Sequence, residues 1–334
     1  MATYHDIERL EAELMSDPAS AERRERLLFA YAEDDRTLSD PRRFAHIRWF
    51  IRHHPGHRIA ASPLAHPDPT RHAAAYMALE AEWRAALDDH PGDETVVRAT
   101  ALYLALNRPA EGRALLEALL ETRPLAADVW LDLGRLSADP ASRLAAFQRA
   151  RSCGSTAPNL LVWIAHAAAL AGELDAADTA CDELQALIDG ARAAHGEALD
   201  WPESGRALWA RARETTGDDD SALALTQAIS DYAFRCHWLH IVQGLIAVEL
   251  GDAPAAVRHL HASARVQPDF RLRAYGPCLD LATRLHALGF ATDVLAYLHE
   301  WERRWDDERV RTWVEQAQRG DPPGPSPGPT GVTP

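Results

Sequence analysis

Residues 124–158 read PLAADVWLDLGRLSADPASRLAAFQRARSCGSTAP, and this stretch decides the fold. Its apolar side chains recur at steps of three and four residues, which is the period of an amphipathic helix. The Asp139-Pro140 pair divides the stretch into two helices, because proline is tolerated at a helix start but not inside a helix. The stretch therefore predicts one helical hairpin.

The hairpin pattern returns along the chain with a nearly constant period. Pro91, Pro124 and Pro158 lie about 34 residues apart, and a period of this length is typical of stacked helix pairs. A later stretch, 240–268, repeats the pattern with the small residue Gly244 at an expected helix crossing. A hairpin cannot bury its apolar face alone, so neighbouring hairpins must stack. We therefore predict an all-α solenoid.

The repeats resemble the tetratricopeptide repeat (TPR) family over residues 92–302. Trp130 and Gly134 match the W-x2-L-G start of the family's first helix, and Pro158 falls at the family's closing position. The turn at 138–140 departs from the family pattern, because it carries Asp-Pro where the family has glycine. The resemblance implies a right-handed α-solenoid whose concave groove binds a peptide or a helix.

The last repeat, residues 273–301, is similar to the closing unit of uncharacterised bacterial TPR-like proteins. Gly276-Pro277 precedes a Leu-Ala helix, and the run Val-Leu-Ala-Tyr-Leu at 294–298 lies in the helix that follows. This likeness implies a bacterial protein of that type and brings no known activity.

The TPR resemblance also implies which side chains line the groove, because the first helix of each hairpin faces it. The groove candidates are Arg98, Asp132, Arg135, Trp163, His166, Ile241 and Leu245. The family's carboxylate clamp uses Lys and Asn, which this chain lacks there, whereas Arg98 and Arg135 are able to hold a carboxylate bidentately. The residues leave a second interpretation open, in which Trp163 is core and both arginines pair with Asp132.

The period breaks at both ends of the array, and the breaks define the expected domains. Residues 1–72 form an irregular helical part with a Pro- and His-rich loop at 56–70, and the array follows at 73–302. The charged stretch 303–319 predicts a capping helix. We expect the tail at 320–334 to be disordered, because its Pro- and Gly-rich sequence cannot bury a core.

Composition excludes several classes of function. The net charge of −15 repels nucleic acid and anionic membranes. The sequence contains no lysine, which excludes a phosphate-binding loop with its Lys and a Schiff-base Lys. There is no apolar run long enough to span a membrane and no signal-peptide pattern. The cysteines are scattered and form no C-x-x-C pair, so we expect a cytoplasmic protein.

The sequence contains sixteen histidines, which suggest a metal site, but they do not have the spacing of a metal-binding motif. Cys236 and His240 share a helix face near His237, and His259 or His261 on the paired helix lies within reach. A second group surrounds the Pro-rich loop: His53, His54, His57, His66 and His72. Because no H-E-x-x-H or C-x-x-C spacing occurs, we expect neither a metal nor another cofactor.

The sequence carries no motif of a catalytic site, so we expect no enzyme. It favours a non-catalytic scaffold or adaptor that binds a protein or peptide segment in its groove. Two alternatives stay open. One is a regulatory module that senses a small molecule or a metal through the His-rich N-terminal part or through Cys236 and His240. The other is a structural subunit that forms homo-oligomers through Trp305 and Trp313.

Overall fold

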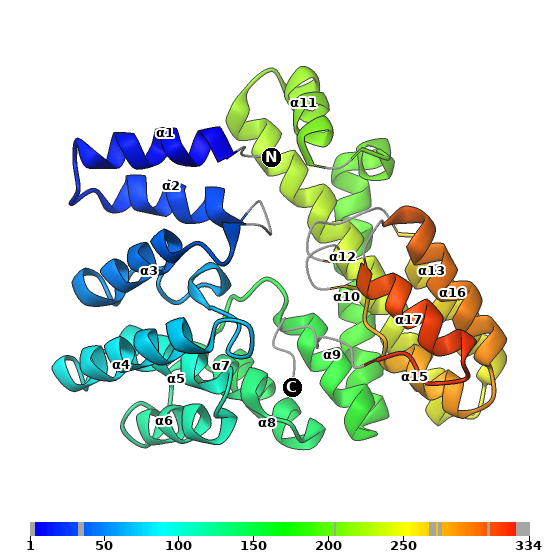
Figure 1. Ribbon diagram of the computed structural model, residues 1–334. Helices are drawn as coiled ribbons and strands as arrows, with labels where there is room; N and C mark the ends of the chain where they lie inside the picture. The colour runs from blue at the N-terminus through cyan, green and yellow to red at the C-terminus, as the bar shows by residue number, and fades with distance from the viewer. Residues whose placement is uncertain are drawn as a thin grey trace. The chain divides into compact units, whose positions relative to one another are not determined.

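The computed structural model describes residues 4–32, 37–203, 205–266, 272, 276–305 and 308–324. Within these residues the fold consists of sixteen α-helices and two short 3-10 helices, with no strand (Figure 1). Helices that follow one another in the chain pack as neighbouring pairs. The expectation of an all-α, solenoid-like fold is therefore confirmed.

The chain divides into two compact units, of which the first is Met1–Ser137. It contains α1 (Tyr4–Met15), α2 (Ala21–Ala32), α3 (Pro41–His53), η2 (Pro63–Ala65), α4 (Ala73–Asp89), α5 (Glu94–Ala105), α6 (Pro109–Thr122) and α7 (Ala127–Leu136). Pro91 lies in the connection that leads into α5, and Pro124 lies in the connection that leads into α7. The repeating prolines thus mark the start of a new helix pair, as their period predicts.

The second unit is Ala138–Pro334. It contains α8 (Pro140–Ser152), α9 (Leu160–Ala171), α10 (Leu174–His195), η3 (Gly196–Asp200), α11 (Gly205–Thr216), α12 (Asp219–Glu249), α13 (Ala253–Ala264), α15 (Asp280–Ala287), α16 (Ala291–Arg304) and α17 (Glu308–Gln318). The long helix α12 contacts α9, α10, α11, α13 and α15. This unit is therefore assembled around α12.

Helix α12 corrects one expectation from the sequence. The repeat pattern begins a hairpin at residue 240 and places Gly244 in its first helix, but that helix already starts at Asp219 and has 31 residues. No proline occurs between Asp219 and Glu249, so nothing in that range interrupts the helix. Neither α12 nor any other described helix is long and apolar enough to cross a membrane.

Aspartate side chains begin several helices at the predicted positions. Asp40 and Asp139 cap α3 and α8, and a proline follows each as the first helical residue. Asp218 caps α12 by accepting a hydrogen bond from the Ser221 N–H at 2.8 Å. Such side chains satisfy N–H groups that have no partner inside the helix. The interpretation of Asp139-Pro140 as the start of a helix is confirmed.

The segment between α3 and α4 belongs to the core of the first unit. Ile59 and Ala65 are buried and pack in one cluster with Trp83 and Tyr103. The Pro-rich loop at 56–70 is thus ordered by its own apolar side chains, and the 3-10 helix η2 forms part of it.

The C-terminal part of the second unit is rich in buried tryptophan. Trp301 and Trp305 pack with ring centroids 4.4 Å apart, and Trp313 on α17 is also buried. Trp305 and Trp313 thus have most of their surface packed inside the second unit. Gly324 donates its N–H to Gln316 Oε1 at 3.0 Å, so the first residues of the predicted tail contact α17. The remainder of that tail, 325–334, lies outside the described residues.

Two glycines allow helices to approach closely. A Cβ atom at Gly112 would lie 2.3 Å from the carbonyl oxygen of Ala101, and one at Gly244 would lie 2.3 Å from a methyl group of Leu281. Both distances are far below a van der Waals contact. The obstacle at Gly112 is backbone, so a side chain there would push the helices apart, whereas at Gly244 the Leu281 side chain would have to move. The predicted role of Gly244 as a small residue at a crossing is confirmed.

Candidate functional site

Three predicted groove residues of the first unit form an ion-pair network. Asp132 is fully buried, and its two carboxylate oxygens accept hydrogen bonds from Arg98 at 2.7 Å and from Arg135 at 3.1 Å. Arg98 also donates to Asp128 at 2.9 Å. Burial opposes the charge of Arg98, but the two aspartates outweigh it and raise the Arg98 pKa. These contacts match the interpretation in which both arginines pair with Asp132.

The four predicted groove residues of the second unit lie inside it. Trp163, His166, Ile241 and Leu245 are each at most 4% exposed. The Trp163 ring packs against Phe147, with ring centroids 5.7 Å apart. All four side chains therefore pack within the core of the second unit.

The histidines around the 56–70 loop pack separately against aromatic rings of the first unit. The ring neighbours are Trp49 for His53 and His54, Phe50 for His57, Tyr103 for His66 and Phe44 for His72. Burial, together with the charge of Arg43, lowers the pKa of His66 to about 4. Within the described part of the chain, these histidines do not gather into a group of three metal-ligating side chains.

Cys236 and His240 lie on the wall of one pocket of about 340 Å³ in the second unit. His240 Nδ1 lies 3.4 Å from His259 Nδ1, and burial lowers the pKa of both histidines. His237 makes other contacts, because its Nδ1 donates to the carbonyl oxygen of Ser263 at 3.0 Å. As far as the chain is described, Cys236 and His240 belong to no group of three metal-ligating side chains.

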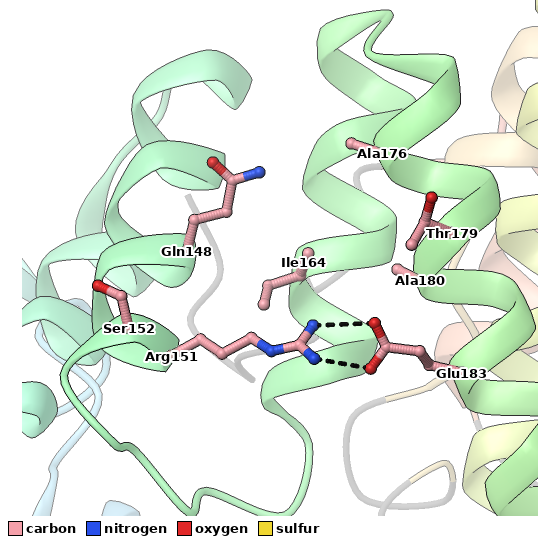
Figure 2. Close-up of a pocket in the computed structure, with 8 residues that line it drawn as sticks. All are labelled: Gln148, Arg151, Ser152, Ile164, Ala176, Thr179, Ala180 and Glu183. Atoms are coloured by element: carbon pink, nitrogen blue, oxygen red, sulfur yellow. Dashed lines mark hydrogen bonds and ion pairs between the residues drawn. The ribbon is translucent and has the colours of Figure 1, made fainter.

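A larger pocket of about 510 Å³ lies between α8, α9 and α10 (Figure 2). Arg151 of α8 reaches Glu183 of α10 through two hydrogen bonds of 2.7 and 3.2 Å, and Ile164 of α9 lies between the two helices as an apolar wall. The other lining residues are Gln148, Ser152, Ala176, Thr179 and Ala180. The pocket therefore combines an apolar wall, small residues and one charged pair.

The Arg151–Glu183 pair can exchange partners at low cost. Both side chains are about half exposed, and exposed ion pairs contribute only about 0–1 kcal/mol. A ligand that offers a cation to Glu183 or a carboxylate to Arg151 can therefore replace one partner. Neither residue was predicted from the sequence. Their separation of 32 positions is close to one repeat, and this spacing is the sequence signal that places them on neighbouring repeats.

A further pocket, of about 600 Å³, lies in the first unit beside α5 and α6. Its lining includes Pro91, Leu87, Val97 and Leu119, so it is mainly apolar. Arg123 at its edge donates to Glu94 at 3.2 Å and to the carbonyl oxygen of Gly92 at 2.8 Å. This pocket has apolar surface but lacks a charged pair that spans it.

His166, Cys278 and Asp280 form the one group of three metal-ligating side chains in the described residues. His166 Nε2 lies 2.8 Å from Asp280 Oδ2 and 3.9 Å from Cys278 Sγ, and the sulfur lies 3.5 Å from the same carboxylate oxygen. His166 and Cys278 are each 1% exposed, whereas the Asp280 side chain is 33% exposed. The cluster is therefore buried but open to solvent at its carboxylate.

Hydrogen bonds from two other helices hold the backbone of Cys278. Its N–H donates to His237 Nε2 at 3.3 Å, and its carbonyl oxygen accepts from the Tyr297 hydroxyl at 3.4 Å. Burial lowers the pKa of His237 to about 4, so its Nε2 remains a neutral acceptor near pH 7. The position of the thiol is thus set by α12 and α16.

The cluster does not have the geometry of a nucleophilic relay. In such a relay the imidazole uses one nitrogen for the nucleophile and the other for the carboxylate. Here His166 Nε2 faces both groups, and its buried Nδ1 has no hydrogen-bond partner among the described residues. Burial alone raises the pKa of Asp280, but hydrogen bonds from His166 and Cys278 and the charge of Arg143 outweigh it and lower that pKa. The result is a convergent set of nitrogen, sulfur and carboxylate oxygen.

Only His166 of this cluster was a candidate from the sequence, where it was predicted to line the groove, and neither Cys278 nor Asp280 was singled out. His166 and Asp280 are 114 positions apart, so no local spacing brings them together. The Cys-x-Asp sequence directly after Gly276-Pro277 was the only local signal.

The comparisons with known proteins identify no relative. No family model matches this chain, and no curated protein matches it.

Proposed function

We propose that this chain is a non-catalytic, TPR-like adaptor of the bacterial cytoplasm that binds a segment of a partner protein. The pocket between α8, α9 and α10 carries the proposal, because it joins an apolar wall at Ile164 to the exchangeable Arg151–Glu183 pair. Interfaces of this kind rest on a few anchors rather than on total area. None of the predicted groove residues lines this pocket, so the pocket replaces them as the proposed binding surface.

The chemistry of the pocket favours a basic segment with an apolar anchor. An apolar side chain of the partner would pack on Ile164, and Ala176 and Ala180 leave room for the partner's backbone. A neighbouring Arg or Lys would take Glu183 from Arg151. The net charge of −15 supports this choice, because a negative field attracts basic partners and repels acidic ones.

A displayed peptide library tests both parts of the proposal. The full-length chain is panned against peptides in which one apolar residue is flanked by either Arg or Glu. We expect the enriched peptides to be basic. Their affinity should fall at least about tenfold in Thr179→Trp, which fills the pocket, and in Glu183→Arg, which removes the anionic partner.

The control is Glu117→Arg on α6. Glu117 accepts a hydrogen bond from Arg113 at 2.7 Å in an exposed pair outside the pocket, so the charge change matches Glu183→Arg. This variant should bind like the wild type. If peptides bind Thr179→Trp as tightly as the wild type while circular dichroism shows unchanged helicity, the pocket is not the binding surface. If the enriched peptides are acidic, the predicted partner charge is wrong.

A further inference from the structure

We infer that His166, Cys278 and Asp280 form a zinc site in the second unit. The three residues supply one nitrogen, one sulfur and one carboxylate oxygen, all within 4.8 Å of one another. Zinc accepts these three donor types together, whereas Mg²⁺ and Ca²⁺ prefer sites made of oxygen alone. The inference is independent of the pocket and of the adaptor function.

The distances approach those of a zinc site, and two of the three separations must change by about 0.3–0.5 Å. Zinc–ligand bonds of about 2.0–2.3 Å in tetrahedral geometry separate the ligand atoms by roughly 3.3–3.6 Å. The sulfur already lies 3.5 Å from Asp280 Oδ2 and 3.9 Å from His166 Nε2. Only the His166–Asp280 separation of 2.8 Å is too short. A hydrogen bond holds this pair, and zinc would take the place of its hydrogen atom. Zinc binding would therefore also lengthen the separation between His166 Nε2 and Asp280 Oδ2.

The surrounding charges and solvent access also fit. A zinc ion with one thiolate and one carboxylate has no net charge, so the nearby Arg143 does not repel the complex. The partly exposed Asp280 side chain provides the access route and leaves room for water as the fourth ligand. An open position for water distinguishes this site from closed zinc sites with four protein ligands.

The site would link parts of the second unit that are distant in sequence. His166 lies on α9, whereas Asp280 is the first residue of α15 and Cys278 lies two residues before it, 114 and 112 positions later. A ligand that binds only the folded chain stabilises it by mass action.

The buried His166 Nδ1 has no hydrogen-bond partner among the described residues, and metal-bound histidines usually donate from that second nitrogen. We therefore expect weaker binding than in closed four-ligand sites.

Metal titration of the reduced, chelator-treated full chain tests the inference. We expect one Zn²⁺ per chain and a thermal midpoint that rises with zinc concentration. Co²⁺ in place of Zn²⁺ should give a thiolate-to-metal charge-transfer band and the visible bands of a tetrahedral site. Cys278→Ser should abolish the charge-transfer band and weaken zinc binding at least about 100-fold.

Two further variants separate a lost ligand from a lost fold. Asp280→Asn changes a partly exposed side chain and should weaken zinc binding at least about tenfold with unchanged helicity. Cys236→Ser removes the thiol of the other Cys–His group and should leave zinc binding unchanged. The inference is overturned if folded wild-type protein binds no stoichiometric zinc or gives no charge-transfer band with Co²⁺. It is also overturned if Asp280→Asn binds zinc like the wild type, or if Cys236→Ser abolishes binding.

Discussion

Gly112 is the residue at which the packing of α5 and α6 leaves no room for a side chain. A Cβ there would lie 2.3 Å from the carbonyl oxygen of Ala101 and 3.2 Å from the Cβ of Ala105. Backbone atoms cannot move aside by changing rotamer, so the helices must separate. We predict that Gly112→Ala lowers the free energy of unfolding by about 1–3 kcal/mol, as measured by urea unfolding followed by circular dichroism.

Gly190 provides the matched control for this substitution. It also lies inside a helix, but it is exposed and a Cβ there would meet no atom within 4 Å. Alanine is the better helix former, so Gly190→Ala should raise the free energy of unfolding by up to about 1 kcal/mol. Equal stability of the two variants would contradict the close approach at Gly112.

Single residues could be predicted from sequence only where their partners lie within one repeat. The pairing of Arg98 and Arg135 with Asp132 was one of two interpretations, because a repeat of about 34 residues places Arg98 and Asp132 at equivalent positions. His166 and Asp280 are separated by several repeats, so their contact depends on how helices beyond the nearest neighbours pack. Periodicity contains no information on such contacts.

At the scale of the element, Asp93 determines where α5 begins. Its carboxylate accepts the N–H groups of Thr95 at 2.8 Å and Val96 at 3.3 Å. Asp93→Ala should lower the free energy of unfolding by about 1 kcal/mol, because these N–H groups lose their acceptor. Asp93→Asn retains an acceptor and should keep most of the stability. Chemical denaturation of both variants tests this, and an equal loss in the two would contradict the capping role.

Helix boundaries could be predicted from the sequence where particular residues interrupt helices. Pro91, Pro124 and Pro158 separate helix pairs, so the boundaries around α5, α7 and α9 could be predicted. Within α12 no proline interrupts the chain, so the first helix of the hairpin expected from residue 240 extends back to Asp219.

At the scale of the whole molecule, sequence periodicity predicted the fold class better than the arrangement of units. The period near 34 residues predicted stacked helix pairs, and the described residues form an all-α fold of that kind. The division between Ser137 and Ala138 falls inside the stretch that the period assigns to one array. The sequence period reflects only that adjacent helix pairs pack together. The geometry of that packing can change along the chain without a change in the period.

The core of the first unit lies entirely within Met1–Ser137, which predicts that this fragment folds alone. Its described apolar clusters draw on α1 to α7 and on the segment between α3 and α4, and Tyr103 of α5 packs on Trp83 and Tyr76 of α4. We expect the isolated fragment to be helical and to unfold in one cooperative thermal transition. The control fragment, residues 1–89, lacks Tyr103 and should melt without a cooperative transition. If Met1–Ser137 also melts without one, its folding depends on the rest of the chain.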